Sequence, residues 1–209
     1  NPNGAGNQLP LAMAHRGFSR DGLENSLAAF RAAVAMGYGY LETDVHTTSD
    51  GVRRLFPLSP LDLVTNGRPK VSALTAAFVA EILIGGREPI PTFDALVADL
   101  PGVRLNLDVK DWNSVRSTAA AIERHEVHDR VLVTSFSDRR RRAVLRLLSR
   151  PVAASAGVAS IGLFTLLGPV LPGPVFRLVM RRVLRGLHAL QVPVRRGGIE
   201  VVTPGFIRR

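Results

Sequence analysis

Acidic and histidine side chains recur in the first quarter of the chain at spacings that could support metal and proton chemistry. Glu42, Asp44 and His46 alternate along one apolar stretch, and the triplet His-Arg-Gly at positions 15–17 ends an earlier one. Alternate side chains of a β-strand project to the same side, so two carboxylates and an imidazole would share one face. Carboxylate oxygens are preferred ligands of hard divalent cations. The grouping predicts a cation site beside an acid/base group.

A strand, a helix and a second strand would bring these groups together. The apolar pattern predicts a strand at Leu11–His15, an amphipathic helix at Glu24–Met36 and a strand at Tyr38–His46. Parallel α/β sheets and barrels carry their chemistry at the carboxyl ends of successive strands, which is where these polar groups fall. An exposed acidic strand face without a metal is the alternative, but Leu41 and Val45 indicate a strand that is buried on its other side.

Further motifs follow in order along most of the chain. They are His15-Arg16-Gly17, Glu24-Asn25-Ser26-Leu27-Ala28-Ala29-Phe30, Glu42-x-Asp44-Val45 with Thr48 and Asp50-Gly51, Ile90-Pro91-Thr92, and Ser135-Phe136. Together they resemble the glycerophosphodiester phosphodiesterase family. The resemblance implies an α/β fold, a TIM-type (β/α)8 barrel of the phospholipase C-like phosphodiesterase type. It also implies hydrolysis of glycerophosphodiesters to an alcohol and glycerol 3-phosphate, with Ca²⁺ or Mg²⁺ as the divalent cation.

The resemblance assigns roles to individual residues. These are the metal ligands Glu42, Asp44 and Asp108, the phosphate contacts Arg16 and Lys110, and the acid/base group His15. The family carries Glu where this chain has Asp108, so the carboxylate reaches one methylene less far. Cation coordination tolerates the shorter reach only if the backbone or a water compensates for it.

One segment departs from the family pattern. Pro57 stands where the family carries a second histidine, and proline cannot donate a proton. Loss of a general acid or base costs about 10²–10⁴-fold in rate. His46 could lend a proton instead, although a lone strand histidine is more often hydrogen-bonded in place. Three functions therefore stay open: an impaired hydrolase, a weak or inactive relative that binds phosphate or phospholipid headgroups, and a lyase related to spider-toxin phospholipases that releases a cyclic phosphate.

Composition restricts the partners. The net charge of +10 comes mostly from arginine and favours anionic partners, while the absence of cysteine excludes disulfides and thiolate chemistry. The basic run Arg139–Arg142 has no interleaved aromatic residues, so we expect a solvated helix face and no nucleic-acid binding. The partner would be a small glycerophosphodiester or a phospholipid headgroup. Residues 1–10 read as a flexible lead-in rather than a signal peptide, and we expect a cytoplasmic protein with peripheral membrane contact as an option.

Helices and strands continue to alternate in the second half. The expected elements are helices at Thr92–Asp99, Asn113–Glu126 and Asp138–Ser149, strands at Val103–Lys110, Val131–Phe136 and His188–Val192, and a helix starting at Thr203-Pro204. His125 and His128 are expected on the surface. About six strands cannot close an eight-stranded barrel, so we expect one domain, residues 1–209, that is incomplete at its carboxyl end.

The uncharged stretch Pro151–Phe176 contains many glycines and prolines, which predict a strand and a loop-rich lid rather than a membrane span. The following segment Pro174–Gly186 is amphipathic, with Arg177, Arg181 and Arg185 at every fourth position. Such a helix could cover the outside of a barrel or lie on an anionic bilayer.

Overall fold

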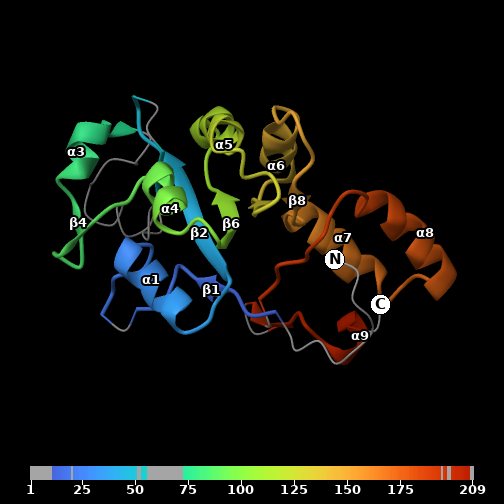
Figure 1. Ribbon diagram of the computed structural model, residues 1–209. Coiled ribbons are helices and arrows are strands. Elements are labelled where there is room, and N and C mark those ends of the chain that lie inside the picture. The colour runs from blue at the N-terminus through green and yellow to red at the C-terminus, as the bar shows by residue number, and fades with distance from the viewer. Residues whose placement is uncertain are drawn as a thin grey trace.

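A computed structural model describes residues 11–19, 21–50, 53–55, 73–193, 195–196 and 199–207 (Figure 1). A mixed sheet forms the centre. Its parallel strands are β1 (Ala14–His15), β2 (Tyr40–Thr47), β6 (Arg104–Val109), β7 (Val131–Thr134) and β8 (Ala153–Ala154), in that spatial order, and β3 (Arg53–Leu55) pairs with β2 in the antiparallel sense. Successive parallel strands with intervening helices are the arrangement of a TIM-type barrel, so the predicted fold class is confirmed, with five parallel strands of such a barrel within the described ranges.

Helices follow most of the strands and cover the sheet (Figure 1). They are α1 (Leu27–Ala35), α3 (Ala76–Ala80), α4 (Phe93–Asp99), α5 (Asn113–Arg124), α6 (Asp138–Leu145), α7 (Val158–Leu167), α8 (Gly173–Val183) and α9 (Pro204–Ile207). Two small hairpins complete the described elements, β4 (Leu83–Ile84) with β5 (Glu88–Pro89), and β9 (Arg195–Arg196) with β10 (Ile199–Glu200).

Hydroxyl side chains start several of these helices. Ser26, Thr92 and Ser137 each precede a helix and accept a hydrogen bond from the backbone N–H three residues on. This arrangement satisfies a donor that the first helical turn leaves without a partner. Thr92 is the N-cap that the sequence predicted, and the helix that follows it ends at Asp99 as expected.

The main core lies between the sheet and its covering helices. Leu41 and Val45 of β2 pack there with Leu105 and Leu107 of β6, and Phe30 of α1 is fully buried among them. These strand residues alternate in sequence with polar ones, so burial of the apolar set turns Glu42, Asp44, Asn106 and Asp108 to the opposite face of the sheet. Burial of this core therefore fixes the face on which the acidic residues meet.

Two predicted elements are corrected by the structure. The loop-rich lid is wrong, because Val158–Leu167 is the helix α7, with Gly157 at its N-cap and Gly168 at its C-cap. These two glycines mark the helix ends, and a third, Gly162, lies within the helix, where a single glycine is tolerated. The sixth strand at His188–Val192 is reduced to one parallel bridge between Ser155 and Ala189. It lies at the predicted place beside β8 but is much shorter.

Two predicted surface groups are buried. His128 is 5% exposed, with Nε2 at 3.1 Å from Glu123 Oε1 and Nδ1 at 3.0 Å from Arg150 Nη2. Arg141 is 3% exposed, and its Nη1 donates to the Ser155 carbonyl at 2.7 Å, so the 139–142 run is not a uniformly solvated face. His125 is partly buried against the Phe93 ring. The expected lead-in at 1–10 and the altered family segment around Pro57 lie outside the described residues.

Candidate active site

Neighbouring strands bring the acidic residues together. In the parallel pairing of β2 with β6, Asp44 is the register partner of Asp108, and Glu42 is the partner of Asn106. One carboxylate oxygen from each of Glu42, Asp44 and Asp108 lies within 4.8 Å of the other two, and all three residues are buried. The sequence predicted Glu42 and Asp44 on one face, the family resemblance added Asp108, and the structure brings the three together.

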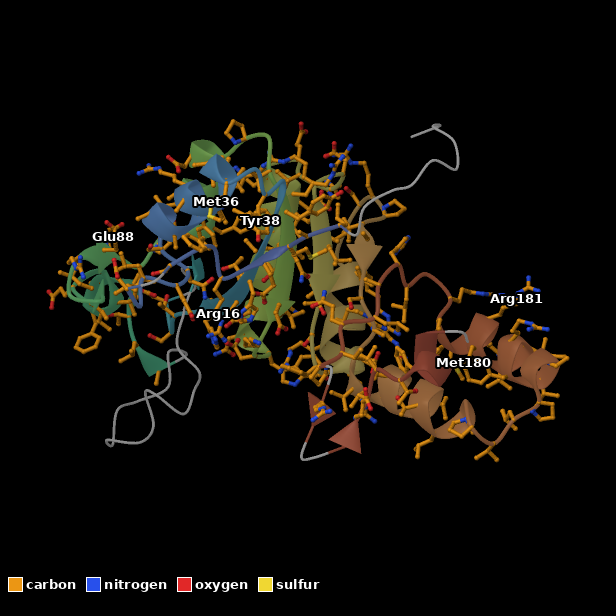
Figure 2. The ribbon with its side chains drawn as sticks, turned by 90° about the horizontal axis from the view of Figure 1, so that it is seen from below. Arg16, Met36, Tyr38, Glu88, Met180 and Arg181 are labelled. Carbon is orange, nitrogen blue, oxygen red and sulfur yellow. The ribbon has the colours of Figure 1, made fainter. Side chains whose placement is uncertain are left out.

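Two basic side chains contact this acidic cluster, Glu42, Asp44 and Asp108. Arg16 Nη2 lies 2.9 Å from Asp44 Oδ2, and Lys110 Nζ lies 3.0 Å from Asp44 Oδ1 and also contacts Asp108 Oδ2. Figure 2 shows Arg16 beside the strands of the sheet. Two cationic side chains therefore face three carboxylates, and the cluster retains an excess of negative charge when all three are ionised.

The protonation of the cluster reflects this imbalance. Burial, together with the negative charges of Asp44 and Asp108, raises the pKa of Glu42 to about 8. Burial acts to lower the pKa of Lys110, but the carboxylates of Asp108 and Asp44 outweigh it, so the pKa of Lys110 is raised. The ammonium group is thereby kept charged between the two aspartates.

The cluster has the properties of a cation site. The buried oxygens Glu42 Oε2 and Asp108 Oδ1 have no hydrogen-bond partner among the described residues. A buried acceptor without a donor is costly, and a cation would satisfy it. The donor set is all oxygen and the charge excess is negative, which suits a hard divalent cation such as Ca²⁺ or Mg²⁺.

The turn after β1 positions the histidine and the arginine. Arg16 and Gly17 both have positive φ, of 56° and 81°, and a Cβ at Gly17 would lie 2.7 Å from the backbone carbon of Ala29. Only glycine fits this close approach. His15 Nε2 lies 3.6 Å from Glu42 Oε2, and 71% of the His15 side chain is exposed. The turn thus places an accessible imidazole beside the acidic cluster.

His46 has a different environment from His15. Its Nδ1 lies 3.0 Å from Asp111 Oδ2, and Asp111 Oδ1 accepts hydrogen bonds from the backbone N–H and the hydroxyl of Ser114. Burial acts to raise the pKa of Asp111, but the bonds from His46 and Ser114 outweigh it and lower the pKa. His46 is only 6% exposed and is held in an imidazole–carboxylate pair.

Several site residues escaped the sequence analysis. Asn106 shares the face of Asp108 on β6, a position that the alternation of that strand could have revealed. Asp111 became visible only through its contact with His46. Arg140 had been counted as surface, yet its Nε donates to Ser135 Oγ at 2.9 Å, and the negative charges of Asp108 and Asp111 act on it. The Phe136 ring lies under Lys110, with Nζ 5.0 Å from the ring centroid.

The sequence pattern of the glycerophosphoryl diester phosphodiesterase family matches residues 15–155, a span that runs from His15 through β8 and includes the whole acidic cluster. The chain belongs to this family. It is a glycerophosphodiester phosphodiesterase-like hydrolase, as the order of its motifs predicted.

One relative agrees with this family assignment, and two solved structures share the fold. The Mycobacterium tuberculosis protein named probable glycerophosphodiester phosphodiesterase 2 is 38% identical over 205 residues, which are 95% of this chain and 74% of the relative. A glycerophosphodiester phosphodiesterase structure from Agrobacterium tumefaciens superposes with a TM-score of 0.64 at 22% identity, covering 85% of this chain and 84% of the other. An Oleispira antarctica phosphodiesterase, solved with its product sn-glycerol-3-phosphate, has a TM-score of 0.61 at 20% identity, covering 88% and 85%.

Proposed function

We propose that this protein hydrolyses glycerophosphodiesters in lipid metabolism with the help of a divalent cation held by Glu42, Asp44 and Asp108. The observation that carries the proposal is the convergence of three buried carboxylates within 4.8 Å, with oxygens that lack a hydrogen-bond partner among the described residues. A divalent cation bound there would offset negative charge on a phosphoryl oxygen and polarise the phosphorus–oxygen bond. Ca²⁺ and Mg²⁺ both suit the ligand set, and a carboxylate oxygen of Asp108 lies within 4.8 Å of those of Glu42 and Asp44 in spite of the shorter side chain.

The basic residues of the cluster would bind the phosphate. Arg16 presents a planar guanidinium that suits two oxygens at once, while Lys110 supplies a point charge. Contacts with Asp44 hold both side chains in place before substrate arrives. Such preorganisation reduces the free-energy cost of aligning charge against the phosphodiester.

Proton transfer would fall to the histidines. His15 is accessible beside the cluster and is the group that we assign to protonation of the leaving alkoxide. His46 is the second candidate, because the carboxylate of Asp111 would stabilise its imidazolium form. Without a histidine at position 57, these two groups divide the proton chemistry, and we expect a rate below that of a relative with the full family pattern.

The substrate would be a small glycerophosphodiester such as glycerophosphocholine. Support comes from the product bound in the Oleispira antarctica relative and from two phosphate-binding side chains at the acidic cluster. The test is incubation of the protein with glycerophosphocholine and added Ca²⁺ or Mg²⁺, with identification of the products. Choline and glycerol 3-phosphate are expected. A cyclic phosphate would indicate a lyase instead, and no product from a folded sample would contradict the hydrolase.

A second function is a relative that binds phosphate or phospholipid headgroups with little or no turnover. Pro57 favours it, because one proton-transfer group of the family is replaced there. Headgroup binding that survives His15→Ala, without hydrolysis by the unchanged protein, would support this function over the enzyme.

A further inference from the structure

Helices α7 and α8 extend away from the central sheet and form a unit of their own in both views (Figures 1 and 2). We call residues 158–185 the α7–α8 hairpin. Phe164, Phe176 and Met180 are its buried centre, and the rings of Phe164 and Phe176 meet edge to face with centroids 5.2 Å apart. Phe206 of α9 packs on Phe164 at 4.9 Å. This small core holds the two helices together and leaves their outer surfaces in contact with solvent.

The outer surface of the hairpin is apolar. The large hydrophobic side chains exposed there are Val158, Leu163, Leu166, Val170, Val175 and Leu178. Leu166, Val170 and Leu178 are each more than 70% exposed. Helix α7 contains no charged residue at all. A helix that is apolar all round is ordinarily buried, so we expect another surface to cover the exposed apolar side chains of α7.

Every charge on the hairpin is positive. Arg177, Arg181, Arg182 and Arg185 of the α8 region are exposed, and the sequence contains no acidic residue between Asp138 and Glu200. Helical spacing puts Leu178 on the same side of α8 as Arg181, Arg182 and Arg185. Figure 2 shows Arg181 on the outer side of the helix, away from the sheet. The outer side of α8 therefore combines the exposed Leu178 with unopposed positive charge.

We propose that the α7–α8 hairpin binds an anionic lipid bilayer at its interface, with Leu166, Val170 and Leu178 among the acyl chains and the arginines at the headgroups. The apolar side chains lie near the turn between α7 and α8, and Arg181, Arg182 and Arg185 follow further along the chain, an order that matches the two layers of such an interface. Long arginine stems can lie along apolar surface while their charged ends reach lipid phosphates. A second copy of this chain is a poorer partner for this surface, because its arginines would lie against these arginines and the positive charges would repel each other.

The position of the hairpin relates the bilayer to the acidic cluster. Helix α7 starts just beyond the carboxyl end of β8, and the Val158 N–H donates to the Phe136 carbonyl at 3.0 Å. The Phe136 ring in turn lies under Lys110 of the site. The hairpin thus emerges from the end of the sheet that carries the site, and lipid binding by it does not depend on whether the site is catalytically active.

The test is cosedimentation of the full chain with vesicles of phosphatidylcholine alone and of phosphatidylcholine mixed with phosphatidylglycerol. We expect binding to the anionic vesicles that weakens with added salt. Arg181→Gln with Arg185→Gln should weaken it by about five-fold for each arginine. The matched control is Arg142→Gln with Arg146→Gln, which removes two exposed arginines at the same spacing on α6 and should leave binding unchanged. Leu166→Ser with Leu178→Ser should also weaken binding, with no change in the far-ultraviolet spectrum of the folded protein.

Three results would overturn the proposal. One is the absence of vesicle binding by the unchanged protein. Another is an equal loss with both arginine pairs, which would indicate attraction through the total charge alone. The third is concentration-dependent self-association that the leucine variants relieve while vesicles have no effect, which would assign the surface to a second copy of this chain.

Discussion

Asp44 and Asp108 are register partners in the parallel strands β2 and β6, and the ammonium group of Lys110 contacts both carboxylates. The pairing of the strands, rather than any loop, sets the separation of these two acids. Glu42 lies one strand repeat away on the same face and adds the third carboxylate. A site built on paired strands is rigid, so the three carboxyl groups stay close together whether or not a ligand is present.

The charge excess predicts how the protein responds to cations. Glu42→Gln should raise the thermal stability of the cation-free protein above about pH 4.5, because burial and the charges of Asp44 and Asp108 disfavour the ionised carboxylate that Glu42 carries in the unfolded chain at such pH. The same change should abolish stabilisation by Ca²⁺ or Mg²⁺, which in the unchanged protein amounts to about 2.7 kcal/mol at a cation concentration of 100 times Kd. Thermal unfolding with and without cation measures both effects. Glu81→Gln, at an exposed position, should keep the full cation response. A full cation response that persists after Glu42→Gln would contradict the assignment of Glu42 as a metal ligand.

The two histidines should differ in their effects. His15→Gln is expected to lower kcat by about 10²–10⁴-fold with little change in Tm, because the side chain is largely exposed. His46→Ala should destabilise the fold by about 1–3 kcal/mol, since it leaves the Asp111 carboxylate without its imidazole partner. Steady-state kinetics and urea unfolding on both variants separate the roles. A full rate from the His15 variant would remove that residue from the proton chemistry.

Restoring the family histidine should increase the rate. Pro57→His is expected to raise kcat by about 10²-fold or more, because a second proton-transfer group typically contributes that much. Pro60→His is the matched control, since it makes the same change three residues away, and it should have no such effect. If neither variant gains activity, the headgroup-binding relative becomes the better account of this chain.

The turn that carries Arg16 should not tolerate a side chain at Gly17. Gly17→Ala combines a positive φ of 81° with a Cβ that would lie 2.7 Å from Ala29 backbone carbon. Gly37→Ala has a similar φ of 91° but open space around the new Cβ, so it isolates the backbone cost of about 1–2 kcal/mol. Chemical unfolding should show a larger loss for Gly17→Ala, together with weaker phosphate binding. Equal losses would mean that the contact with Ala29 relaxes freely.

Glu123 predicts a dependence of stability on pH. Hydrogen bonds from the Ser149 N–H and hydroxyl, with a further one from His128, lower the pKa of Glu123 to about 2. A depressed carboxyl pKa stabilises the fold above the unfolded-state pKa, and this contribution is lost as the pH falls from about 4.5 to about 2. The difference in free energy of unfolding between the protein and Glu123→Gln should therefore shrink over that range. Glu126→Gln, an exposed neighbour, serves as control, and a difference that stays constant with pH would contradict the prediction.

Periodicity and capping residues were sufficient to place most elements. The apolar alternation of β2 and β6 and the hydroxyl of Thr92 are local signals, and the structure confirms the elements they predicted. The same alternation predicted that Glu42 and Asp44 share one face, because strand geometry leaves a side chain only two directions. Asp108 joins them through the pairing of β2 with β6, and its part in the cluster was predicted from the family resemblance rather than from alternation.

Features that depend on tertiary neighbours could not be predicted in this way. His128 is buried because Glu123 and Arg150 both contact it, and Arg141 is buried because the carbonyl of Ser155, which follows β8, accepts a hydrogen bond from its guanidinium. Glycines at the ends of α7 were taken as interruptions, since glycine composition alone does not separate a helix end from a loop. Burial of the two side chains depends on tertiary contacts that sequence pattern does not specify. A glycine can be assigned to a helix end only when the position of the helix is known.

The most direct test of the central claim is to titrate Ca²⁺ or Mg²⁺ into chelator-treated protein and to follow bound cation and glycerophosphocholine hydrolysis in the same samples. The account predicts that the rate rises with occupancy of one cation per chain, and that Glu42→Gln and Asp108→Asn lose binding and turnover together. Full hydrolysis in the presence of chelator, or cation binding that both variants retain, would contradict it.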